Sequence, residues 1–124
     1  MTGTVRPSRI DTPADLAALV MHQDGAVVSQ TLAKARGGTV TVFAFDAGEG
    51  LSEHEAPFEA LVLGLDGRAE VTVGGMDHAL GAGEILRLPA NVPHAVAATE
   101  RFKMLLIMIR DDVGAPGRSG ASSA

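Results

Sequence analysis

The stretch ALVLGLDGRAEVTVGGMDHALGAGEILRL, residues 60–88, decides the fold. Its apolar runs are separated by three turn signals, namely Asp66-Gly67, Gly74-Gly75 and Gly81-Ala82-Gly83. Glycine-containing turns between short runs rich in Val and Leu are typical of β-hairpins. The stretch therefore predicts four consecutive strands, at residues 60–65, 68–73, 76–80 and 85–88.

On the amino-terminal side, residues 26–33 and 39–45 predict a further hairpin with its turn at Arg36-Gly37-Gly38. Before that hairpin, Thr12-Pro13-Ala14-Asp15 has the form of a helix start. We expect an arm and one short helix in residues 1–25, with the helix ending near His22.

On the carboxyl-terminal side, the two prolines in residues 89–93 predict a loop, and residues 94–98 resume the strand pattern. Residues 102–109 are apolar at almost every position, which predicts a strand buried on both faces or one at a subunit interface. Residues 111–124 contain little that could be buried, and we expect a disordered tail there.

Eight or nine short strands in one chain of 124 residues predict an all-β sandwich or barrel. A double-sheet jelly roll over residues 26–110 leaves few open sheet edges and encloses a cavity between the sheets, where a ligand would bind.

The net charge, the length of the apolar runs and the cysteine content limit the classes of function that this chain can have. The net charge of −5 disfavours nucleic acid and anionic membrane surfaces, and no apolar run is long enough to span a membrane. The absence of cysteine excludes disulfides and thiolate chemistry and fits a reducing compartment, so we expect a cytoplasmic protein.

Two histidines, His54 and His94, each lie beside a strand-like run that we expect to start at the histidine. Because the chain between them must fold back as hairpins, the pair can meet only inside a barrel. Two imidazoles alone do not fill a metal coordination shell.

The sequence around these histidines resembles the two motifs of small cupins. The first motif is represented by Gly48, His54 and Gly67, and the second by Gly83, Pro89 and His94. The resemblance implies a jelly-roll barrel with both imidazoles inside it.

The resemblance also shows departures, because Ala56 stands where the cupin pattern has a second His, and Ala60 where it has a Glu. Glu59 is one residue early, so its side chain points inward only if a bulge or the bend at Pro57 redirects it. The metal shell that the resemblance implies is therefore His54, His94, Glu59 and water, which suits Zn, Ni, Fe or Mn.

We expect four large apolar side chains to lie in the pocket wall or the core: Phe43, Phe58, Met104 and Met108. Three functions stay open: a metal-dependent enzyme, a metal-free module that binds or senses a small molecule, and a structural dimer without a ligand. The resemblance and the apolar final run both indicate a homodimer.

Overall fold

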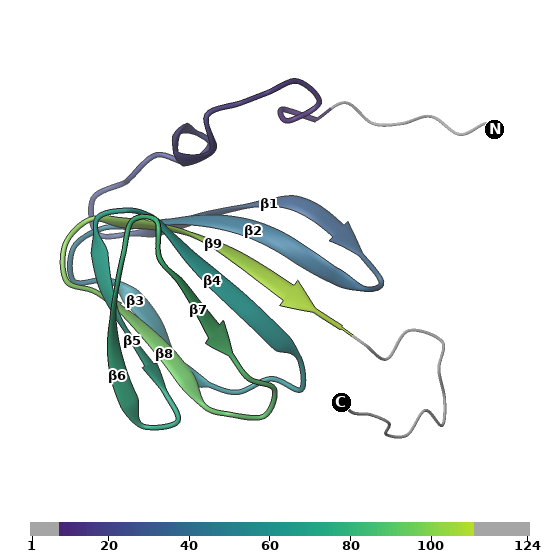
Figure 1. The fold of residues 1–124 in the computed structure, drawn as a ribbon. Coiled ribbons are helices and arrows are strands. Elements are labelled where there is room, and N and C mark those ends of the chain that lie inside the picture. Colours follow the sequence, from purple (N-terminus) through teal and green to yellow (C-terminus); the bar gives the residue numbers. More distant parts are fainter. Residues whose placement is uncertain (1–7, 111–124) are drawn as a thin grey trace.

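The computed structural model describes residues 8–110, and in this part of the chain nine β-strands form two antiparallel sheets (Figure 1). The strands are β1 (Val27–Ala35), β2 (Gly38–Phe45), β3 (Gly50–His54), β4 (Glu59–Asp66), β5 (Arg68–Val73), β6 (Met76–Gly81), β7 (Ile85–Leu88), β8 (His94–Ala98) and β9 (Phe102–Ile109). Eight of these strands follow predicted runs, with boundaries that differ by one or two residues at most, whereas β3 lies where no run was predicted.

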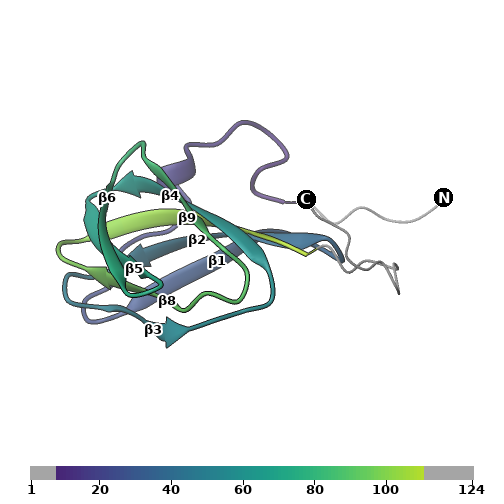
Figure 2. The same ribbon diagram turned by 60° about the horizontal axis from the view of Figure 1, so that its bottom comes forward.

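The two sheets face one another as the layers of a jelly roll. One has the order β1-β2-β9-β4-β7 and the other the order β3-β8-β5-β6, and Figure 2 shows them enclosing a common interior. The predicted all-β jelly roll is confirmed. The turn between β4 and β5 depends on Gly67, whose φ of +75° is costly for residues with a Cβ.

The main core lies between the sheets. On β4, Ala60 and Val62 are buried there, whereas Leu61 and Leu63 alternate to the outer face. The remaining buried members of this core come from both sheets: Phe45, Ala69, Val71, Leu80, Leu88, Val96, Ala98, Phe102 and Met104. Period-two alternation therefore gives most strands an apolar inner face.

The amino-terminal segment covers part of the outer face of the five-stranded sheet. Leu19 and Val20 form a second cluster there with Val42 and Ala44 of β2. Lys103 anchors this segment, because its Nζ donates to the carbonyl of Ala17 at 2.6 Å.

The helix in this segment is the single 3-10 turn η1, Leu16–Ala18. It is shorter than the start signal at Thr12 indicated, because Asp15 is the N-cap and its backbone is still extended. One turn is enough to lay Leu19 and Val20 on the sheet. Residues 1–7 of the predicted arm and the predicted tail, residues 111–124, lie outside the described residues.

Strand β9 is the middle strand of its sheet, between β2 and β4. Phe102 and Met104 are buried in the main core, and Leu105 packs on the opposite face against the amino-terminal cluster. This position explains why the run is apolar on both faces. Ile109, at the end of the strand, is 46% exposed.

Candidate functional site

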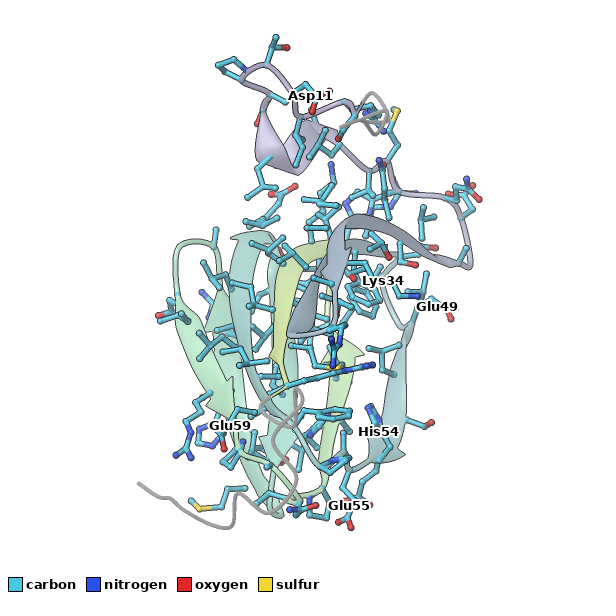
Figure 3. The ribbon with its side chains drawn as sticks, turned by 90° about the vertical axis from the view of Figure 1, so that its right-hand side faces the viewer. Asp11, Lys34, Glu49, His54, Glu55 and Glu59 are labelled. Atoms are coloured by element: carbon cyan, nitrogen blue, oxygen red, sulfur yellow. The ribbon has the colours of Figure 1, made fainter. Side chains whose placement is uncertain are left out.

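His54 and His94 lie directly opposite one another on neighbouring strands, as paired residues of β3 and β8. Their ring centroids are 4.5 Å apart and the rings meet edge to face at 68°. Figure 3 shows His54 at the end of the barrel where Glu55 also lies. His94 begins its strand as expected, but the expectation for His54 is wrong, because His54 is the last residue of β3.

Backbone carbonyl groups fix the orientation of both rings. Nδ1 of His54 lies 2.9 Å from the carbonyl oxygen of Ser52, and Nδ1 of His94 lies 3.2 Å from that of Val92. Since a carbonyl only accepts, each neutral ring donates its Nδ1–H and carries a free lone pair on Nε2. This is the tautomer that can bind a metal ion or accept a hydrogen bond through Nε2.

The pKa of His94 lies below its ordinary value of 6.5. Burial is the largest cause, the hydrogen bond to the Val92 carbonyl opposes it, and the neighbouring His54 lowers the pKa further. His94 is therefore neutral at pH 7, and its Nε2 can act as a ligand or acceptor.

An apolar cavity of about 50 Å³ opens beside the two histidines, between the two sheets. The two imidazoles are the only ionisable groups among its lining residues, which are Leu51, His54, Ala56, Phe58, Ala60, Val62, Leu88, His94, Ala95, Val96, Met104, Leu106 and Met108. This arrangement of apolar walls with convergent polar groups is typical of small-molecule sites.

Of the residues assigned to the pocket wall, Phe58, Met104 and Met108 line the cavity. Phe43 is not among the lining residues and instead stacks on Phe45, with ring centroids 5.8 Å apart. Phe43 is partly buried and packs against the main core.

Two kinds of residue at this site were not predicted from the sequence. Ala56 and Ala60 line the cavity with side chains that leave it open, and their departures from the cupin pattern were the available signal. Arg110 was also missed. Its guanidinium lies 4.9 Å from the centroid of the Phe58 ring. Because the two residues are distant in the sequence, no local motif predicts this contact.

Glu59 is not brought to the histidines. Its Oε1 accepts from Nε of Arg87 at 2.7 Å, and its Oε2 accepts from the backbone N–H of Ala90 at 3.1 Å. These hydrogen bonds, that of Arg87 first, lower the pKa of Glu59 and hold the group as a carboxylate. Figure 3 shows Glu59 and His54 on opposite sides of the barrel end.

The register explains why Glu59 lies elsewhere. Glu59 pairs with Ile109 and Ala60 with Met108 in a regular ladder, and the irregularity in this pair of strands falls between Gly64 and Asp66. No bulge therefore redirects Glu59, and strand alternation places it on the outer face while Ala60 lines the cavity.

A metal shell with a carboxylate does not fit this geometry. Among residues 8–110, no three His, Asp or Glu side chains are grouped closely enough to hold an ion. His54 and His94 alone fit as two nitrogen ligands, and water or a bound molecule would have to complete the shell. The described residues also include no helix of the length and apolarity needed to cross a membrane.

The two facing sheets, the histidine pair at one end with His54 exposed, and the cavity beside the pair define a small jelly-roll barrel. The sequence profile of the cupin domain matches residues 41–110, more than half of the chain. This chain belongs to the cupin family. No protein of curated function matches it.

Solved structures share the barrel. A cupin superfamily protein from Desulfitobacterium hafniense is 32% identical with a TM-score of 0.80, over 88% of this chain and 100% of that one. A conserved protein of unknown function from Streptococcus pyogenes is 32% identical with a TM-score of 0.79, over 83% of this chain and 90% of that one.

A cupin 2 conserved barrel domain protein from Leptotrichia buccalis is 45% identical, with a TM-score of 0.74 over 77% of this chain. This chain spans 46% of that longer protein.

Proposed function

We propose that this cupin binds a small, uncharged organic molecule in the cavity, with His54 and His94 as its polar anchors. One observation carries the proposal: both Nδ1–H groups are bonded to carbonyl oxygens, so both Nε2 atoms are free acceptors beside otherwise apolar walls. The complementary ligand carries a hydroxyl, amide or amine N–H beside a short apolar body.

The size of the cavity limits the ligand. Its volume of about 50 Å³ is roughly a third of the cavity of about 150 Å³ that accommodates benzene. Met104 and Met108 are among the walls, and flexible methionine side chains allow a site to adjust to irregular shapes. A ligand of a few heavy atoms therefore fits best, and a larger one requires these side chains to move.

The test is a ligand-observed NMR screen of small alcohols, amides and other uncharged hydrogen-bond donors against metal-free protein. We expect at least one class to bind, and His54→Ala or His94→Ala to weaken it by about 10-fold, as expected for one lost hydrogen bond. The matched control is His78→Ala on β6, because His78 does not line this cavity. Equal binding by the wild type and the His54/His94 double variant would overturn the proposal.

A divalent transition metal, Zn, Ni, Fe or Mn, bound through His54 and His94 is the second candidate. It is supported by the 4.5 Å separation of the ring centroids and by the two free Nε2 atoms. Such an ion would supply Lewis-acid chemistry to a molecule held in the cavity.

The measurement for this second candidate is elemental analysis of protein purified without a histidine tag, followed by titration with each ion. Binding of one ion per chain that is lost in the His54/His94 double variant supports it. If no ion is retained and no added ion binds, the metal candidate is excluded.

We also propose that the protein acts in the cytoplasm, because a chain without cysteine fits a reducing compartment.

A further inference from the structure

One part of the cavity wall is not held in a sheet. Within residues 8–110, every lining residue belongs to a β-strand except Ala56 and Phe58, which lie between β3 and β4. Segments outside the strand ladders open locally at a lower free-energy cost than the strands themselves. Phe58 is the larger of the two residues, and it is therefore the wall residue best suited to move.

Phe58 lies at the open end of the cavity. Deeper in the barrel the cavity is lined by Val62 and Met104, which are both buried. His54 ends β3, His94 begins β8 and Phe58 directly precedes β4, so these three residues share one end of the barrel. All three are at least partly exposed. The Phe58 ring thus borders the opening through which a ligand enters.

Arg110 covers this ring. Its guanidinium carbon lies 4.9 Å from the centroid of the Phe58 ring, a geometry in which the cation is attracted to the negative face of the aromatic ring. The backbone N–H of Arg110 donates to the carbonyl of Gly37 at 2.8 Å, which fixes the residue directly after the end of β9. Arg110 is therefore an anchored partner that holds a side chain of the cavity wall.

We propose that Arg110 is a specificity-determining residue of the cavity, and that the Phe58 ring it holds is a gate that limits the size of the ligand. The gate is closed while the guanidinium lies over the ring, and it opens when the Phe58 side chain moves away from the opening. This inference rests on the proposed function, because it concerns ligands of the same cavity. His54 and His94 select the hydrogen-bonding group, whereas Arg110 selects size through Phe58.

The strength of the contact suits a gate. An exposed cation–π contact changes a two-state equilibrium by about 2- to 5-fold, which corresponds to about 0.5–1 kcal/mol. This factor favours the closed position and still allows the ring to open thermally. Because a guanidinium is not deprotonated in proteins, the force that closes the gate does not vary with pH.

The test follows the methyl NMR signals of Met104 and Met108, which line the cavity, while metal-free protein is titrated with linear alcohols of increasing length. A short alcohol fits behind the closed ring, whereas a long one holds the ring open and so opposes the contact with Arg110. The ratio of affinity for the longest to the shortest alcohol that binds should therefore rise by about 2- to 5-fold in Arg110→Gln.

A double-mutant cycle separates the gate from a general loss of stability. In Phe58→Leu the ring is absent, so adding Arg110→Gln should leave the affinity ratio unchanged. Arg68→Gln is the matched control, because it removes an exposed arginine at the start of β5, and its ratio should equal that of the wild type. Arg110→Lys keeps the charge and should restore part of the discrimination by length.

Three outcomes would each overturn the gate. These are equal discrimination by length in the wild type and Arg110→Gln, an equal effect of Arg110→Gln with and without the Phe58 ring, and no response of the two methionine signals to any alcohol. The proposed function is judged separately with the His54/His94 double variant. Discrimination that depends on Arg110 and persists at unchanged affinity in that variant supports the gate and counts against the histidine anchors.

Discussion

Arg87 holds both carboxylate oxygens of Glu59, with Nε donating to Oε1 at 2.7 Å and Nη2 donating to Oε2 at 3.2 Å. The two residues lie on β7 and β4, on the outer face of the five-stranded sheet, while Ala60 and Leu88 beside them line the cavity. The carboxylate of Glu59, next in sequence to the cavity residue Ala60, is therefore held in a surface ion pair.

Glu59→Gln should leave ligand and metal affinity at the two histidines unchanged. The carboxylate is outside the cavity, and its loss removes an exposed ion pair, whose effect on stability is small. Titration of metal and organic ligand into the variant and the wild type checks this. A marked loss of metal affinity in Glu59→Gln would contradict the assigned position of Glu59.

Ala60→Glu should create the carboxylate ligand that the chain lacks. Ala60 lines the cavity, so a glutamate there reaches the histidines, and Zn(II) affinity should rise by at least about 10-fold. Ala56→Glu is the comparison variant at another lining position, and competition with a zinc indicator is the measurement. No gain in Ala60→Glu would mean that position 60 does not face the histidines.

Stability should fall as the pH drops below 6.5. Burial lowers the pKa of His22 and His94 from 6.5, so the unfolded chain binds more protons than the native state below that pH. The loss runs from pH 6.5 down to the lowered native pKa values, where the slope flattens. Urea unfolding at intervals between pH 8 and about 5 measures it, above the range in which carboxylates protonate.

His22 provides the matched variant for this pH dependence. Burial is the largest cause of its lowered pKa. The nearby Lys103 and Arg101 lower the pKa further, whereas Asp66 and a hydrogen bond with the Phe45 backbone raise it. His22→Leu should therefore reduce the slope of stability against pH. An unchanged slope would contradict the contribution of His22 to the pH dependence of stability.

Gly67→Ala should destabilise the barrel more than Gly75→Ala. Both glycines have positive φ, +75° and +84°, and that conformation alone costs an L-residue about 1–2 kcal/mol. A Cβ on Gly67 would also collide with the carbonyl oxygen of Arg101, whereas one on Gly75 meets nothing within 4 Å. Denaturant unfolding of both variants measures the difference, and equal costs would contradict the close approach at Gly67.

We propose that the protein forms a homodimer through the outer patch, an apolar area on the five-stranded sheet formed by Leu61, Leu63, Ile85, Ile107 and Ile109. Ile85 is 58% exposed and Ile109 is 46% exposed. The amino-terminal cluster does not include these five residues. A patch of this kind is suited to a symmetric contact with a second copy.

Light scattering should therefore give twice the chain mass of 12.7 kDa. Ile85→Asp combined with Ile109→Asp should yield monomers. Met76→Asp, at an exposed position on β6 of the other sheet, should not. A wild-type monomer at micromolar concentration would contradict the dimer.

Residues 60–88 show why so much of the barrel was predictable. Their glycine turns and period-two apolar runs are local features, and β4 to β7 follow them closely. The helix was less predictable, because local start signals at Thr12 compete with the tertiary contacts of Leu19 and Val20 on the sheet.

The sequence by itself determined eight of the nine strands and the jelly roll, because turn chemistry and period-two alternation act over a few residues. The resemblance to cupins implied that His54 and His94 meet, and the register of β3 with β8 pairs them. Only the tertiary structure decided where Glu59 points, that Phe43 does not line the cavity and that Met108 adjoins Ala60. Each of these depends on the register between strands distant in sequence, which sets the face and the neighbours of every side chain.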